Sequence, residues 1–180
     1  QPIRVHAAKE VIDILERDIF NWSVYPKFSE LTNDNGSVLE YSMLLPMVES
    51  EIRHLTLTPV EMNHKVPTCG FVIADTNNTI AFTGDTAGTD LFWEKLNDIS
   101  RLDALFIECA FPDELSALAE VSHHLTPKGL AAELEKFDRP DCRVFVINLK
   151  PMYRERIIEQ INKLDLLRVE VLGVGREYEI

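Results

Sequence analysis

Residues 70–86 read GFVIADTNNTIAFTGDT, and this stretch decides how the chain folds. Two apolar runs, Gly70 to Ala74 and Thr79 to Thr83, flank the letters DTNN, which have the composition of a tight turn. The stretch therefore predicts a β-hairpin. Its second strand leads into GDT, which places the carboxylate of Asp85 at a strand end, where functional side chains are often presented. Because Asp is also a preferred helix N-cap, a purely structural role for Asp85 stays open.

The residues on either side of this hairpin follow two different patterns. Upstream, Ala7 to Phe20 has apolar residues at helical spacing, and Val38 to Asn63 is strand-like. Downstream, strand and helix patterns alternate, and the whole arrangement is typical of a layered α/β sandwich. We find no repeat or linker, which predicts one domain over residues 1–180. Downstream helices are predicted at Asp90 to Ile99, Pro127 to Phe137 (capped by Thr126) and Pro151 to Leu164, and buried strands at Ala104 to Cys109 and Arg143 to Ile147.

Composition narrows the classes of function. Eighteen Lys and Arg against 30 Asp and Glu give a formal net charge of −12, which disfavours nonspecific binding to nucleic acid. A small anionic substrate could still be held by a metal or a local cationic pocket. No apolar run approaches the roughly 20 residues that span a bilayer, so we expect a cytoplasmic protein without a membrane segment. Cys69, Cys109 and Cys142 lack CxxC spacing and lie in or beside apolar runs, which predicts reduced, buried thiols.

Three further segments carry side chains suited to catalysis or metal binding. His64 follows a strand one hairpin upstream of Asp85, so the two side chains can meet at one sheet edge and hold a metal. His123 and His124 precede a helix start, and at most one of them is expected to face a site, as a proton donor or acceptor. Asn148 ends a buried strand and could simply cap the next helix. Taken singly, the histidines could also be ordinary surface or core residues.

In their order along the chain, these segments resemble the metallo-β-lactamase superfamily. The phrases NHKVPTCGF, FTGDT, HHLTP and INLKP resemble its successive C-terminal motifs. Within it, IFNWSVYPKF, HLTPKGLAAELEKF and NLKPMYRERIIEQI are similar to class II cyclic-nucleotide phosphodiesterases. The resemblance implies the C-terminal portion of an αββα sandwich, with two divalent metal ions, zinc first among the candidates. It implies that His64 and Asp85 are metal ligands, Asp85 bridging the ions, and that Asn148 stands where the family has its last His ligand.

The same resemblance implies a reaction, the hydrolysis of a small 3′,5′-cyclic nucleotide such as cAMP or cGMP. Two metal ions would polarise the phosphoryl oxygens and lower the pKa of a bridging water to near neutral. The resemblance makes His124 the expected proton donor to the leaving 3′-oxygen. Glu108, at the end of a predicted strand, is its expected partner, although a lone carboxylate there could merely be solvated.

Two departures from the family leave other functions open. The HxHxDH signature, which supplies most of the family's ligands, does not occur in the 180 residues, and an amide oxygen at Asn148 is a poorer zinc ligand than imidazole. A degenerate, noncatalytic interaction module is therefore one alternative. A tRNA 3′-end processing ribonuclease is another, because that family shares the motifs, but the net charge and the lack of a basic arm count against it.

The apolar strands also imply a partner. Ala104 to Cys109 and Arg143 to Ile147 are nearly continuous in apolar residues, which is the pattern of strands covered on both faces. The predicted helices cover one face only, and leaving the other in water costs about 25 cal/mol for each Å². We therefore expect an incomplete domain that opens in mid-fold at Gln1. The second face would be covered by a missing N-terminal half, by a second copy in a homodimer or by another subunit.

Overall fold

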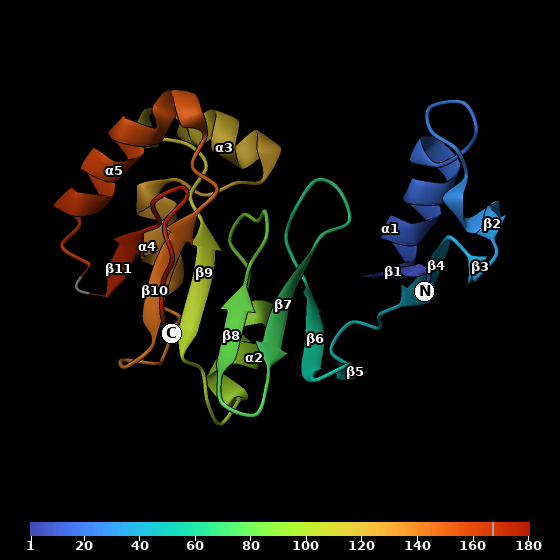
Figure 1. Cartoon of the computed structure of the whole chain (residues 1–180). Coiled ribbons are helices and arrows are strands. Elements are labelled where there is room, and N and C mark those ends of the chain that lie inside the picture. Colours follow the sequence, from blue (N-terminus) through green and yellow to red (C-terminus); the bar gives the residue numbers. More distant parts are fainter. Residues whose placement is uncertain (167) are drawn as a thin grey trace. The chain divides into compact units, whose positions relative to one another are not determined.

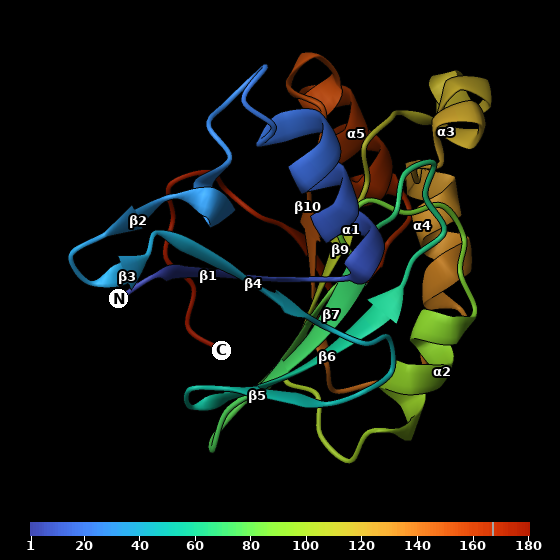
Figure 2. The ribbon, with the colours of Figure 1, turned by 90° about the vertical axis from the view of Figure 1, so that its right-hand side faces the viewer.

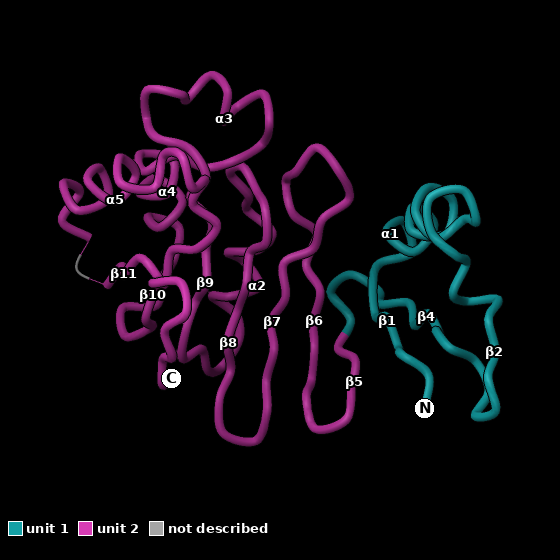
Figure 3. Tube along the Cα trace, turned by 45° about the horizontal axis from the view of Figure 1, so that its top comes forward, with its two compact units in different colours: residues 1–48 teal, residues 49–180 magenta. Residues whose placement is uncertain are grey.

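The computed structural model describes residues 1–166 and 168–180 (Figure 1). The chain divides into two compact units, residues 1–48 and residues 49–180 (Figure 3). The expectation of one domain over the whole chain stays a prediction. Within the described residues, no helix is both long and apolar enough to cross a membrane.

The first unit is a small α/β element in which two parallel strands are joined through a helix. The register of the strands places Val5 opposite Tyr41. The helix predicted between Ala7 and Phe20 is present, but its second half is wound as a π-helical turn. The elements of the unit are β1 (Ile3–Ala7), α1 (Lys9–Ile14), the π-helical turn (Leu15–Ile19), a 3₁₀ turn (Phe28–Glu30), β2 (Thr32–Asn33), β3 (Gly36–Ser37) and β4 (Leu39–Met43).

The second unit contains a seven-stranded sheet with the order β11-β10-β9-β8-β7-β6-β5 (Figure 1). Strands β5 to β8 pair antiparallel, and β8 to β11 pair parallel, which confirms the predicted change of pattern after the hairpin. The hairpin turn forms because Oδ1 of Asp75 accepts hydrogen bonds from the backbone N–H groups of Asn77 and Asn78, both at 2.7 Å. The strands are β5 (Ser50–Ile52), β6 (Leu55–Glu61), β7 (Cys69–Ala74), β8 (Thr79–Phe82), β9 (Ala104–Glu108), β10 (Arg143–Ile147) and β11 (Val169–Val171).

Helices of this unit cover one face of the sheet (Figure 2). Side chains of Phe92, Leu130 and Ile157 pack there in one core with Leu105 and Val144 of the sheet. The three predicted helices are present, while α3 and β11 were not predicted. The elements are α2 (Leu91–Asp98), a 3₁₀ turn (Asp113–Leu115), α3 (Ser116–Ser122), α4 (Pro127–Leu134), a 3₁₀ turn (Pro151–Tyr153) and α5 (Arg154–Lys163).

The other face of the sheet has its own apolar cluster. Ala104, Phe106 and Phe145 are buried there, and Leu172 and Tyr178 of the C-terminal tail pack against them. The ring of Tyr178 meets the ring of Phe145 edge to face, with centroids 5.6 Å apart. The tail therefore contributes cover to a face for which the sequence predicted only an external partner. Whether another segment or subunit adds to it stays a prediction.

A capping interaction at Thr126 sets where α4 begins. Oγ1 of Thr126 accepts a hydrogen bond from the N–H of Gly129 at 3.3 Å, and Pro127 occupies the first turn, as predicted. Cys109 and Cys142 are buried free thiols, and Cys69 is partly buried. Burial raises the pKa of Cys142 to about 11, so its thiol stays protonated at neutral pH.

Candidate metal centre

His64 lies in the loop after β6, and only 11% of its side chain is exposed. Its Nδ1 lies 2.9 Å from the carbonyl oxygen of His123. A carbonyl oxygen can only accept, so Nδ1 carries the proton and Nε2 is left with a lone pair. That Nε2 lies 3.9 Å from Oδ2 of Asp85, which shows that the two side chains meet, as the hairpin predicts.

Asp85 follows β8 after a sharp turn at Gly84. Gly84 has φ +63°, a conformation that glycine adopts without strain, and this turn carries Asp85 beyond the strand end. While Oδ2 of Asp85 faces His64, Oδ1 accepts a hydrogen bond from the amide nitrogen of Asn148 at 2.5 Å. Asn148 thus reaches the site from the end of β10, but through its nitrogen, which is not a metal ligand. Its predicted role as a ligand through the amide oxygen stays a prediction.

His124 joins the same site from the loop after α3. Only 8% of its side chain is exposed, and its ring centroid lies 5.0 Å from that of His64. His123 has a left-handed backbone, with φ +55°, so the two adjacent rings diverge and His123 contacts Asn63 instead. The structure therefore brings His124, rather than His123, beside His64 and Asp85.

Glu108 at the end of β9 is fully buried and is the partner of His124. Its Oε1 lies 2.6 Å from Nδ1 of His124 and accepts from the backbone N–H of Thr86 at 3.0 Å, while Oε2 accepts from that of Leu125 at 3.4 Å. The alternative of a merely solvated carboxylate is wrong. Burial raises the pKa of Glu108 to about 8, and burial lowers the pKa of His124, because both charged forms lose hydration.

The donor set fits a divalent metal ion. Ligand atoms of His64, Asp85 and His124 all lie within 4.8 Å of one another, and this is the one such cluster of His, Cys, Asp or Glu among the described residues. Zinc takes nitrogen and carboxylate ligands at about 2.0–2.2 Å, so two ligands of one ion lie at most about 4.4 Å apart, and these side chains would move slightly closer together to hold it. Each imidazole has its Nδ1 held by an oxygen of another residue, the usual means of orienting a histidine ligand. Three such ligands leave a fourth position open.

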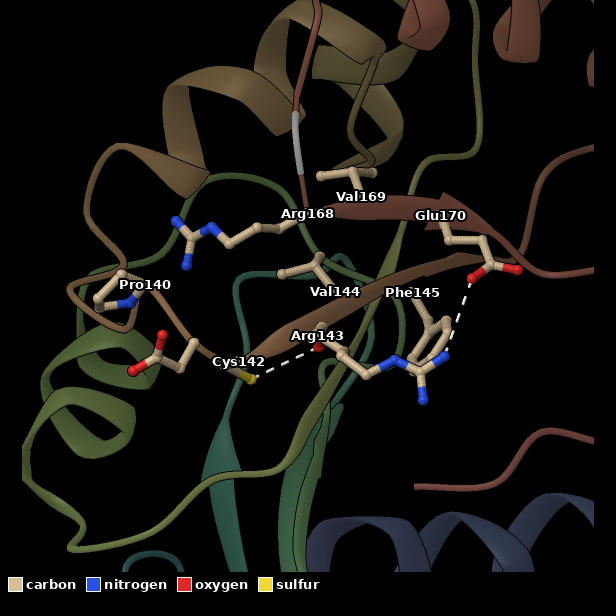
Figure 4. Close-up of a pocket in the computed structure, with 9 residues that line it drawn as sticks. Pro140, Cys142, Arg143, Val144, Phe145, Arg168, Val169 and Glu170 are labelled. Atoms are coloured by element: carbon tan, nitrogen blue, oxygen red, sulfur yellow. Dashed lines mark hydrogen bonds and ion pairs between the residues drawn. The ribbon is translucent and has the colours of Figure 1, made fainter.

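A separate hollow lies beside β10 and β11, near the start of β10 rather than its end (Figure 4). Arg143 and Arg168 line it, but so does Glu170, whose carboxylate is 4.0 Å from the guanidinium of Arg143. Opposite charges are thus already paired in the hollow. None of the three residues of the metal cluster lines this hollow.

Residues 1–146 match the family described as "Beta-lactamase superfamily domain". The chain belongs to this family. Among curated proteins, this β-lactamase superfamily member is 25% identical over 190 residues to a "Probable 3',5'-cyclic-nucleotide phosphodiesterase" of Yersinia pestis, covering 92% of this chain and 54% of the relative.

Solved structures agree on the metallo-β-lactamase fold. The crystal structure of unliganded yeast PDE1 matches with a TM-score of 0.79 at 20% identity, covering 96% of this chain and 58% of that one. Zinc-bound PqqB from Methylobacterium extorquens matches with a TM-score of 0.70 at 13% identity, covering 100% of this chain and 66% of that one. The chain thus spans little more than half the length of the phosphodiesterase relative and of the yeast protein.

Sequence reasoning missed two features of this superfamily member's site. His124 was expected only as a proton donor, yet it stands among the candidate ligands. Asn63 was not singled out at all, although it directly precedes His64 and contacts His123. An amide next to a predicted ligand is a weak signal by itself. The left-handed backbone that brings His123 to Asn63 has no signature in the letters SHHLT.

Proposed function

We propose that this chain forms part of a metal-dependent phosphodiesterase that hydrolyses 3′,5′-cyclic nucleotides, cAMP and cGMP. One observation carries the proposal: a buried Glu108–His124 pair, 2.6 Å apart, opens onto the His64 and Asp85 side chains. A carboxylate and an imidazole beside a metal centre suit the cleavage of a phosphodiester, which needs activated water and protonation of the leaving oxygen. The Yersinia pestis relative, named as a phosphodiesterase, supports the same reaction class.

The metal is proposed to be zinc, held by His64 and Asp85, with His124 as the further candidate. When bound, it supplies a Lewis acid for a phosphoryl oxygen and lowers the pKa of a water. A second ion would need donors beyond this cluster, because Asn148 turns its amide nitrogen to Asp85. We propose that those donors belong to another segment or subunit.

His124 is the proposed proton donor to the leaving 3′-oxygen. Its Nδ1 is engaged by Glu108, which leaves Nε2 as the ring nitrogen available to a substrate. Glu108 holds the ring from a strand end and has no exposed surface, so it acts as a positioning residue. One Nε2 atom cannot both bind a metal ion and donate a proton, so His124 has only one of these two roles. Measuring the zinc content and the turnover of a His124 variant distinguishes them.

Lys150 is proposed to attract the anionic phosphate of the substrate. Its ammonium lies 5.4 Å from the centroid of the Phe111 ring, and that ring packs edge to face on His124. The positive charge of Lys150 also lowers the pKa of His124, after the larger effect of burial, so the ammonium acts on the site electrostatically. A local cation of this kind reconciles an anionic substrate with a chain of net charge −12.

The proposal is tested on the zinc-loaded protein with this chain in its complete assembly, which is incubated with cAMP, cGMP and a precursor tRNA, and the products are separated by chromatography. Opening of the 3′ bond predicts 5′-nucleotides from the cyclic substrates and no cleavage of the tRNA. Lys150→Met should raise KM roughly tenfold, while Lys163→Met, which removes the same charge from the end of α5, should not. Zinc-loaded protein that leaves both cyclic nucleotides intact would contradict the proposal, and cleavage of the tRNA would favour the ribonuclease alternative.

A further inference from the structure

The imidazole of His64 is held by a single backbone carbonyl. The oxygen is that of His123, 59 positions along the chain, and it lies 2.9 Å from Nδ1. This contact decides which nitrogen of His64 carries the proton and therefore leaves Nε2 free beside Asp85. The orientation of the proposed ligand thus depends on the position of one peptide group.

That peptide group belongs to a residue in an uncommon conformation. His123 has φ +55°, and it ends α3, because the N–H of His124 donates to the carbonyl of Ala119 at 2.9 Å. Glycine is the usual residue at such a helix end, since it adopts the left-handed region without a steric cost. A histidine there is the costlier choice for ending a helix, so its ring calls for a separate explanation.

The ring of His123 is anchored by Asn63, the residue directly before His64. Nδ1 of His123 lies 2.8 Å from Oδ1 of Asn63, an oxygen that can only accept, so Nδ1 is the donor. The amide nitrogen of Asn63 donates to the carbonyl of Gly88 at 2.7 Å, and the Asn63 carbonyl accepts from the N–H of Ala87 at 2.8 Å. Asn63 therefore ties together three loops, those that carry His64, His123 and the residues just after Asp85.

We propose that Asn63 and His123 are positioning residues that hold the His123 carbonyl against Nδ1 of His64 and so present Nε2 to a metal ion. The inference rests on the proposed metal centre, but it concerns contacts that form without the ion. Its consequence is that removing the ring or the amide loosens the His64 imidazole, although neither Asn63 nor His123 is itself a ligand. Loss of partners that orient a metal ligand typically weakens metal affinity roughly tenfold or more.

Three variants test the pair: Asn63→Ala, His123→Gly and His123→Asn. Glycine keeps the left-handed backbone and the carbonyl but removes the ring. Asparagine also tolerates that backbone, and its amide can donate to Oδ1 of Asn63. Zinc affinity, measured by chelator competition, should be roughly tenfold weaker than the parent's in Asn63→Ala and His123→Gly. In His123→Asn it should be within about threefold of the parent's. The thermal midpoint should not fall in His123→Gly, because glycine suits the helix end better.

A second measurement does not depend on the metal. At pH 8, where a free imidazole is neutral, ¹⁵N NMR of the zinc-free protein should show the Nδ1–H tautomer of His64 in the parent and in His123→Asn. Asn63→Ala and His123→Gly should show a mixture of tautomers. Parent-like affinity and an unchanged tautomer in both variants would overturn the proposal. If the parent binds no zinc, the metal centre fails, and the tautomer populations alone decide the role of the pair.

Discussion

The side-chain amide nitrogen of Asn148 lies 2.5 Å from Oδ1 of Asp85 and donates a hydrogen bond to it. Asn148 has φ +57°, a left-handed conformation that asparagine tolerates better than most residues. It therefore clamps one oxygen of the carboxylate, while the other faces His64. At the position where the resemblance implied a histidine ligand, this chain has a hydrogen-bond donor.

The first prediction concerns this clamp. Asn148→His replaces a donor with an imidazole, a better zinc ligand than an amide, so zinc affinity should rise roughly tenfold or more. Asn148→Ala is the matched control, because it removes the hydrogen bond to Asp85 without adding a ligand. Chelator competition measures both. An Asn148→His variant that binds zinc no better than Asn148→Ala would show that this position does not reach the ion.

The second prediction separates the two roles of His124. His124→Ala should lower kcat for cAMP roughly a hundredfold or more, the usual scale for losing a proton donor, while zinc content stays unchanged. His54→Ala, in the exposed turn between β5 and β6, is the control and should retain parental turnover. Elemental analysis alongside steady-state kinetics gives the answer. Loss of zinc with turnover would make His124 a ligand instead, and an unchanged kcat would remove it from the reaction.

The third prediction is a pH dependence of stability that originates at Glu108. Burial raises the pKa of this carboxyl to about 8 in the folded chain, against an ordinary value of 4.5, so the folded state binds the extra proton between these values. Stability from Glu108 is therefore complete below about pH 4.5 and is lost as the pH rises towards 8. Between pH 5 and pH 8, the free energy of unfolding of the metal-free parent should fall by roughly 3 kcal/mol more than that of Glu108→Gln.

Urea unfolding of both proteins in the presence of a chelator measures this difference. The glutamine cannot ionise, while His124 titrates in both proteins, so the comparison isolates the carboxyl to first order. Parallel stability curves for the two proteins would show that Glu108 ionises in the fold at an ordinary pH.

The fourth prediction concerns the close packing around Gly70 in the β7–β8 hairpin. A Cβ at Gly70 in β7 would lie 2.8 Å from the carbonyl oxygen of Phe82 and 2.9 Å from atoms of Met62 and Phe92. The nearest atom is backbone and cannot yield, so Gly70→Ala should cost about 1–3 kcal/mol. Gly129→Ala in α4 is the control, because its Cβ would meet only ordinary contacts and alanine favours a helix by about 0.5–1 kcal/mol. Relative to the parent, the midpoint of thermal unfolding should fall in Gly70→Ala and rise in Gly129→Ala.

Much of the framework follows from local patterns. The DTNN turn closes on Asp75, the strand from Arg143 to Ile147 has the predicted bounds, and Thr126 caps its helix. Such features depend on neighbours a few residues apart, whose turn, cap and alternation preferences are readable one segment at a time. Even the meeting of His64 and Asp85 follows locally, because a single hairpin separates them.

Tertiary structure alone decided the remaining features. The contacts of Asn63 with His123 and of Asp85 with Asn148 join residues 60 and 63 positions apart, and the Glu108–His124 pair, which the family resemblance implied, takes its geometry from the fold. Each depends on how strand ends and helix ends meet at one edge of the sheet. The left-handed turn at His123, which separates two adjacent identical side chains, is stabilised by a distant amide rather than by local preference. Likewise, Tyr178 covers Phe145 because the C-terminal tail returns across the sheet. Burial of apolar surface favours this arrangement, and no local periodicity in the sequence indicates it.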